Sequence, residues 1–204
     1  MTDLDALELD DAPFEIPHEF ELDLNCVVVA NHRLTMEGID RSEDEGLDEI
    51  DVEDFETQNS ITNHLHNFYD DLRRAARRLA LVELVTRLQH WIRRLVKELK
   101  LKPDKVYESQ LANLFDALNK ALGIGPVPIA FFEDLVRVRD SVIHADSKAE
   151  WEHNGKARRV ADEYRNAYGD VELTEEQLQD AIHKAVQQVK WYDQNLPPTR
   201  TAKS

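Results

Sequence analysis

Residues 136–146 read Val-Arg-Val-Arg-Asp-Ser-Val-Ile-His-Ala-Asp, and this stretch decides the fold. A helix is predicted over 129–144, because apolar residues recur at the three-to-four spacing of a buried face. These residues are Phe131, Phe132, Leu135, Val136, Val138, Val142 and Ile143. Arg139 falls near the middle of that arc, where a guanidinium is costly unless a group pairs with it. His144 is rotated from it by roughly 140°, so the two serve one site only where the helix ends or bends, or where a second copy completes it.

Residues 139–144 consist of an arginine, an acidic residue, three further residues and a histidine. This spacing resembles the signature of the HEPN superfamily of all-helical domains, in which a histidine follows an arginine after four to six residues. The resemblance covers residues 58–196 in architecture and only 139–144 in motif. It implies an all-α helical bundle. Many HEPN domains are metal-independent endoribonucleases, often toxins or phage-defence effectors, so it also implies an RNA substrate and no cofactor.

The resemblance implies three catalytic residues. Arg139 would hold the scissile phosphate and neutralise developing charge, and Asp140 would orient Arg139 or His144. His144 would act as general base on the ribose 2′-hydroxyl, or as acid on the leaving oxygen. Since HEPN domains commonly dimerise with their motifs face to face, a homodimer is implied, and an antitoxin or regulatory protein is a candidate partner. One HEPN branch carries a tyrosine two residues after the histidine, which receives a nucleotide from its antitoxin. Asp146 stands there in this sequence, so that mode of neutralisation is not expected.

A different interpretation of the same residues stays open. Arg139 would pair with a neighbouring acid, and His144 would be an ordinary helix-terminal residue favoured by the helix dipole. The chain would then be a non-catalytic HEPN-like module that dimerises or docks partners through its helices and an acidic arm. Single changes at Arg139 and His144 discriminate the two, by whether toxicity in cells is lost without unfolding.

Composition favours one sizeable domain with an extension. The 204-residue chain is 42% hydrophobic and 32% charged, which supports a packed core with solvated helices. Its single cysteine, Cys26, excludes an internal disulfide and fits a reducing compartment. No apolar run reaches membrane length, and the N-terminus is acidic where a signal peptide would be positive. We therefore expect a cytoplasmic protein with no membrane partner.

The net charge of −16 is unevenly distributed. Residues 1–57 carry −18, whereas residues 58–204 carry +2. We therefore expect an acidic N-terminal arm over 1–57, partly disordered or docked on the basic helices, and a helical bundle over 58–204. A docked arm would compete with RNA phosphates. Residues 20–30 are rich in β-branched side chains and, with 32–36, are candidate strands of a short β-hairpin in the arm.

Residues 61–101 contain neither glycine nor proline. They predict one helix of about forty residues, or two separated by a kink, with Ser60 as the candidate N-cap. A basic band on this helix consists of Arg73, Arg74, Arg77 and Arg78. Such a band is either a solvated face or a surface that binds RNA phosphates.

Two further helices are predicted, over 107–122 and from a capping box at Thr174 to about residue 196. Gly123 is the expected C-terminal cap of the first. Between the helix predicted over 129–144 and the last predicted helix, residues 147–171 form either a partly helical insertion or a short hairpin that turns at Asn154 and Gly155.

Other chemistries have weaker sequence support. His64 and His66 are two residues apart and point to different sides of a helix, and no cysteine pair or zincin-type motif is present, so no metal ligands are assigned. Ser141 stands three residues before His144 without a nucleophile-elbow context. Cys26 lies in a candidate strand. None of these predicts a nucleophilic or metal site.

Overall fold

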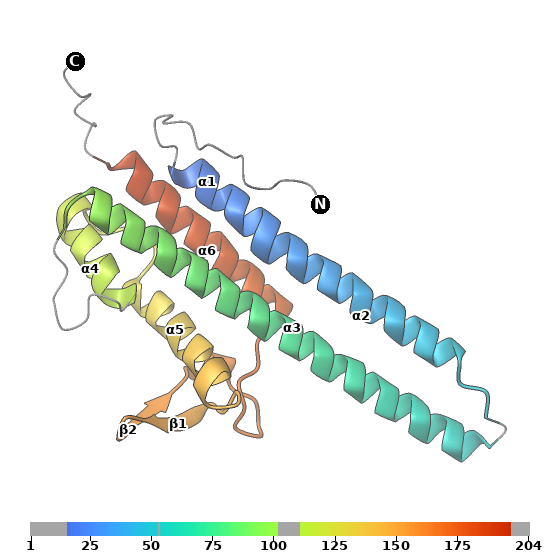
Figure 1. Ribbon diagram of the computed structural model, residues 1–204. Coiled ribbons are helices and arrows are strands. Elements are labelled where there is room, and N and C mark those ends of the chain that lie inside the picture. The colour runs from blue at the N-terminus through green and yellow to red at the C-terminus, as the bar shows by residue number, and fades with distance from the viewer. Residues whose placement is uncertain (1–15, 53, 102–110, 197–204) are drawn as a thin grey trace, which may run out of the picture.

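The computed structural model describes residues 16–52, 54–101 and 111–196, which form a helical bundle with one small hairpin (Figure 1). The helices are α1 (Ile16–Asp23), α2 (Ala30–Asp48), α3 (Phe55–Glu98), α4 (Leu111–Leu122), α5 (Ile129–His144) and α6 (Glu175–Gln194). A π-helical stretch, η1 (Leu24–Val29), joins α1 to α2, and η3 (Asp162–Tyr164) is a short 3₁₀ turn. The hairpin consists of β1 (Glu150–His153) and β2 (Lys156–Arg159). The expected all-α helical bundle is confirmed.

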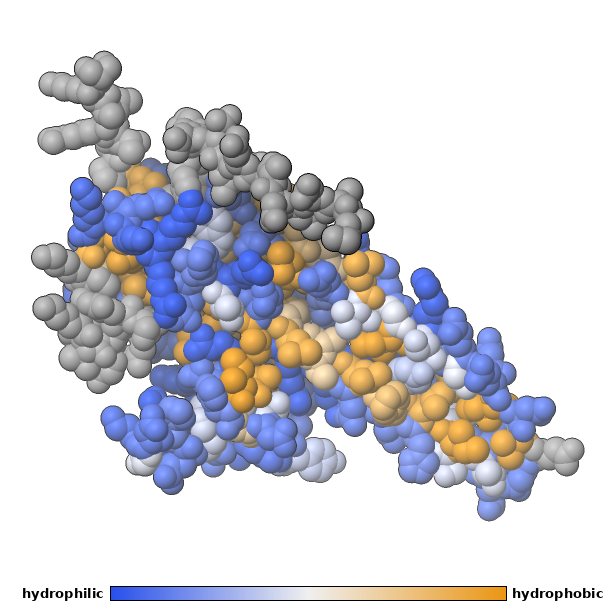
Figure 2. All heavy atoms as spheres, in the orientation of Figure 1, coloured by the Kyte–Doolittle hydropathy of each residue, from blue (hydrophilic) through white to orange (hydrophobic). Residues whose placement is uncertain are grey.

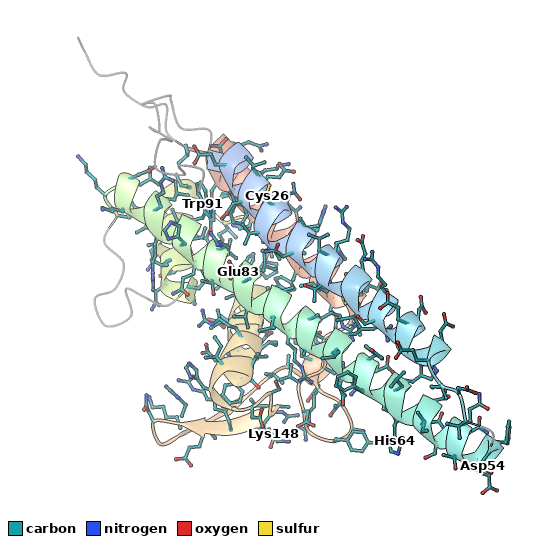
Figure 3. All side chains as sticks on the ribbon, turned by 45° about the vertical axis from the view of Figure 1, so that its right-hand side comes forward. Cys26, Asp54, His64, Glu83, Trp91 and Lys148 are labelled. Atoms are coloured by element: carbon teal, nitrogen blue, oxygen red, sulfur yellow. The ribbon has the colours of Figure 1, made fainter. Side chains whose placement is uncertain are left out.

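Helix α3 is the longest helix of the described structure. It runs unbroken for 44 residues, roughly 66 Å at 1.5 Å per residue. The segment that was predicted as one helix or two is therefore one. It begins earlier than Ser60, because Asp54 is the N-cap and its carboxylate accepts a hydrogen bond from the Thr57 N–H at 2.8 Å. Asp54 marks the far end of α3, where α3 projects beyond the bundle beside α2 (Figure 3).

The buried face of α3 differs between its two halves. Its C-terminal half supplies Leu84, Leu88 and Ile92 to the core. In the projecting N-terminal half, Ile61 is 36% exposed and Phe68 56% exposed, although both are large apolar side chains. Helix α2 covers only one side of this half, so apolar residues on the other side stay at the surface. Figure 2 shows them as orange patches along the projecting pair.

The strands expected over 20–30 and 32–36 are wrong, because both segments are helical. Phe20, Leu24 and Val28 recur every four residues and are each 1% exposed, so the segment buries one helical face. Burial against α3 and α6 outweighs the β-propensity of the valines in η1, since intrinsic propensity is weak beside packing. The hairpin of this fold lies at 150–159 instead, where the sequence left a hairpin and a helical insertion open.

The described part of the acidic arm packs as helix on the rest of the bundle. Glu21 pairs with Lys190 on α6 at 2.8 Å, and Asp23 lies 3.4 Å from Arg87 on α3. Phe20 meets Trp91 edge-on, with ring centroids 5.9 Å apart. Because α3 already begins at residue 55, the boundary expected after residue 57 falls in its first turn.

A buried ion pair joins α2 to α3 further along. Glu43 is 8% exposed, and it accepts hydrogen bonds from Arg73 and, at 2.6 Å, from Nδ1 of His66. The hydrogen bond from Arg73, followed by that from His66, holds the pKa of Glu43 below its ordinary value. A carboxylate whose folded pKa is depressed contributes stability above its unfolded pKa, and this stability is lost as the pH falls through the folded pKa.

We expect Glu43→Gln to lower the free energy of unfolding by about 1–2 kcal/mol at pH 7, because Arg73 loses the most buried of its ionised partners. The difference from the parent chain should shrink below about pH 4, where the native carboxyl also becomes protonated. Urea titrations at pH 7 and pH 3 measure it, with the exposed Glu45→Gln as the matched control. An equal difference at both pH values would contradict the ionic origin of the effect.

The remaining helices begin and end close to where the sequence places them. Helix α5 spans the predicted 129–144. Helix α4 ends at Leu122, and the next residue, Gly123, has a φ of 101°, which suits only glycine well. Thr174 forms the predicted capping box with Gln177 at the start of α6. The first residues of the helix predicted over 107–122 lie outside the described residues. Within the described residues no helix is long and apolar enough to cross a membrane.

Candidate active site at the end of α5

The last two turns of α5 place the three motif residues on one cavity. Arg139, Asp140 and His144 all line a cavity of about 380 Å³. Its other walls come from α3, from the start of α4 and from the hairpin. The rotation of 140° between Arg139 and His144 is therefore no obstacle, since both side chains reach this cavity from one chain.

The guanidinium of Arg139 is held in place within the chain. Its Nε and Nη2 donate to Oδ1 of Asp140 at 3.0 and 2.7 Å, and its Nη1 donates to Oε1 of Gln89 on α3 at 2.9 Å. The side chain is 18% exposed. A single subunit thus pairs this arginine, and an unpaired charge no longer argues for a dimer. This contact fits the expectation that Asp140 orients Arg139, and it fits equally the alternative in which Arg139 pairs with a neighbouring acid.

Arg139 lies at the edge of the buried face of α5 rather than at its middle. The line that faces the core runs through Phe132, Leu135, Val138 and Ser141. Ile143 was expected on that face but is 52% exposed. The apolar residues of α5 surround most of the helix, so periodicity alone did not identify the buried side.

His144 is the last residue of α5, and a tight reversal follows it. Asp146 and Ser147 both have positive φ, at 50° and 63°. The hydroxyl of buried Ser141 donates to the carbonyl of Lys148 at 2.6 Å, which ties the outgoing chain to the helix end. This reversal directs the chain into the hairpin; Lys148, at the hairpin's base, is labelled in Figure 3.

The hairpin adds three residues to the cavity that the sequence analysis did not select. Trp151, His153 and Arg158 line it together with the motif. Trp151 and His153 are two apart on β1, and Arg158 pairs with Trp151 across the ladder, so all three share one face of the hairpin. The turn signal at Asn154 and Gly155 was the sequence sign of this arrangement.

Positive charge predominates around the cavity. Its charged lining consists of Arg93, Arg137, Arg139 and Arg158 against Glu133 and Asp140. Arg137 donates to Asp134 at 2.6 Å and lies 3.8 Å from Glu133, so acids partly offset it. An excess of guanidinium groups with two imidazoles, His144 and His153, favours an anionic ligand such as a phosphodiester.

The basic band predicted to bind RNA lies elsewhere on α3. Arg73 pairs with Asp40 and Glu43, and Arg74 pairs with Asp71 at 2.8 Å. Arg77 donates to the carbonyl of Leu173 at 2.7 Å, and Arg78 donates to that of Val171. None of the four lines the cavity. In the described structure Arg73 joins α2 to α3, Arg77 and Arg78 join the segment before α6 to α3, and Arg74 pairs within α3. RNA binding by the four stays a prediction.

Two histidines outside the cavity, His32 and His66, pair with carboxylates on other helices. Nε2 of His32 lies 2.8 Å from Glu175, which links α2 to the start of α6, and His66 lies beside Glu43. Across residues 16–52, 54–101 and 111–196, no three His, Cys, Asp or Glu side chains gather as a metal site would require. Cys26 is exposed in η1, not in a strand.

Comparisons with known proteins identify no relative. No protein-family model, no curated protein and no solved structure matches this chain.

Proposed function

We propose that this protein is a metal-independent endoribonuclease of the HEPN type. The observation that carries the proposal is the shared cavity of Arg139, Asp140 and His144, in which guanidinium groups predominate. The HEPN-like spacing of these residues supports it further. In this function Arg139 holds the scissile phosphate and stabilises the charge that develops on its oxygens.

His144 carries out one of two proton transfers in this reaction. The 2′-hydroxyl loses a proton as its oxygen attacks the phosphorus, and the departing 5′-oxygen gains one. The products are a 2′,3′-cyclic phosphate and a 5′-hydroxyl. An imidazole suits this role because it takes up and releases protons near neutral pH.

The biological role follows from the resemblance alone. We propose a toxin or phage-defence effector, acting as a homodimer in the cytoplasm and restrained by an antitoxin or regulatory protein. Since Arg139 is paired within one chain, the dimer rests on the family resemblance rather than on an unsatisfied charge.

Cleavage of a mixed RNA pool in excess EDTA tests the reaction. We expect cleavage to persist and to yield 2′,3′-cyclic phosphate ends, because the proposed groups are all protein side chains. End-group analysis of the products and light scattering of the same sample, expected at twice 23.6 kDa, provide the measurements. Cleavage that appears only after Mg²⁺ or Mn²⁺ is added would contradict the proposed mechanism.

A second candidate function is a non-catalytic docking module, and the exposed apolar residues of α3 favour it. Ile61, Phe68, Leu72 and Leu79 are 36%, 56%, 36% and 64% exposed. Their spacing of seven, four and seven residues places them along one side of the helix, as in a coiled-coil seam. In this function the helix face binds a partner and the cavity does no chemistry.

A further inference from the structure

The proposed reaction moves two protons, whereas the Arg-to-His motif of a single subunit supplies one titratable ring. His144 serves one transfer, and a second acid or base must reach the same phosphodiester. Asp140 is a poor candidate, because one of its oxygens already accepts two hydrogen bonds from Arg139. Glu133 lies beside Arg137 at 3.8 Å, and Gln89 does not titrate.

His153 is placed for this second transfer. It lines the same cavity as His144 and Arg139, and its ring centroid lies 5.8 Å from that of His144. The rings are tilted by 33°, so they are not stacked on each other. Each ring nitrogen reaches a hydrogen-bond partner roughly 3 Å away. Two rings at this separation therefore reach different oxygens of one phosphodiester.

The structure around His153 fixes its direction. As the last residue of β1 it pairs with Lys156 in the ladder, on the face of the hairpin that carries Trp151. Trp151 packs against the core, and Ser141 ties the base of the hairpin to α5. The opposite face of the hairpin is occupied by ion pairs of Glu150 with Arg159 and Arg165. One face of the hairpin thus carries His153 into the lining of the cavity, and the other face carries the ion pairs of Glu150.

We infer that His144 and His153 form an acid–base pair in which each ring performs one of the two proton transfers. This inference rests on the proposed ribonuclease function. One ring takes the proton of the 2′-hydroxyl as the 2′-oxygen bonds to phosphorus. The other donates a proton to the 5′-oxygen as the bond between phosphorus and that oxygen breaks. Exchange of one proton with water at each ring restores both to their starting states.

Charged side chains from the walls of the cavity contribute to the electrostatic potential at the rings of His144 and His153. They are Arg93 on α3, Glu133, Arg137, Arg139 and Asp140 on α5, and Arg158 on β2. Lys156, across the ladder from His153, adds a further positive charge. Their net positive charge favours binding of the phosphodiester between the two rings.

The test compares the pH dependence of kcat in the full-length chain and in three variants. We expect a bell-shaped profile for the parent, and about a 10²–10⁴-fold lower kcat for His153→Gln, with one limb of the profile lost and KM nearly unchanged. His144→Gln should lose the opposite limb. The exposed His183→Gln on α6, away from the cavity, is the matched control and should behave as the parent. Added imidazole should partly restore His153→Ala, which a purely structural role would not allow.

Each contrary result has a distinct meaning. Cleavage by His153→Gln with the parent's kcat and both limbs, while His144→Gln is inactive, would overturn the acid–base pair and leave the proposed function standing. A loss confined to KM would assign His153 to substrate binding and likewise overturn it. A parent chain that does not cleave RNA removes the proposed function and the pair together.

Discussion

Replacing His144 by alanine is expected to lower the rate of RNA cleavage by about 10²–10⁴-fold, because one proton transfer loses its general acid or base. Arg139→Ala should cost a similar factor of about 10²–10³, since the charge of the transition state loses a positioned guanidinium. Both side chains line the same cavity, so the double variant should lose less than the product of the two factors. Initial rates of cleavage of one labelled RNA measure all three.

The controls separate loss of chemistry from loss of structure. Arg33→Ala removes an arginine whose side chain is 71% exposed on α2, and His183→Ala removes an exposed histidine on α6. Circular dichroism should show that every variant is folded, and only Arg139→Ala should unfold at a somewhat lower temperature, because it loses the hydrogen bonds of Arg139 to Asp140 and Gln89. Growth arrest on expression, if the parent causes it, should disappear with His144→Ala and Arg139→Ala. Arrest that persists in both folded variants would favour the docking function of the α3 face instead.

Phe20→Ala is expected to lower the free energy of unfolding by about 3–5 kcal/mol, as is typical of a fully buried aromatic side chain. Phe20 is 1% exposed, meets Trp91 edge-on and belongs to the same core as Leu24 and Val28. Truncating its ring leaves a cavity between α1 and α3 that the helices cannot fully close. Urea unfolding followed by circular dichroism measures the loss.

Phe55→Ala provides the matched control, because Phe55 is 73% exposed at the tip of α3 and its removal should change stability by less than about 0.5 kcal/mol. If Phe20→Ala unfolds at the same urea concentration as Phe55→Ala, the N-terminal helices do not contribute to the cooperative core.

The acidic arm also supplies residues of this core. Deleting residues 1–57 removes buried Phe20, Leu24 and Val28, so we expect loss of folded protein rather than the release of an inhibitor.

Local signals in the sequence predicted several elements correctly. The limits of α5, the glycine cap after α4 and the capping box of α6 follow from interactions within a few residues, which any tertiary context preserves. The absence of glycine and proline from residues 61–101 predicted a helix there, but it left open whether that helix is one or two. The close association of Arg139 with Asp140 was also foreseeable, because the two residues are adjacent in the chain.

The errors share one cause. Valines 27 to 29 were assigned to a strand, yet they lie in η1, since burial of the face defined by Phe20 and Leu24 outweighs intrinsic propensity. Ile143 was expected on a buried face and is exposed. In each case the pattern indicated that an apolar face exists but not which neighbour covers it, and that depends on packing between distant segments.

For this protein the sequence alone determined the helical class, both ends of α5, the C-terminal end of α4, the start of α6 and the motif of Arg139, Asp140 and His144, because each depends on residues close together in the chain. Only the tertiary structure decided that Gln89 fixes Arg139 and that His153 and Arg158 join His144 around one cavity. Gln89 on α3 and Arg139 on α5 are 50 positions apart in the chain, and no local periodicity encodes contacts of this kind. They form when burial of the shared core brings the elements together, which is why the candidate site became complete only in the folded chain.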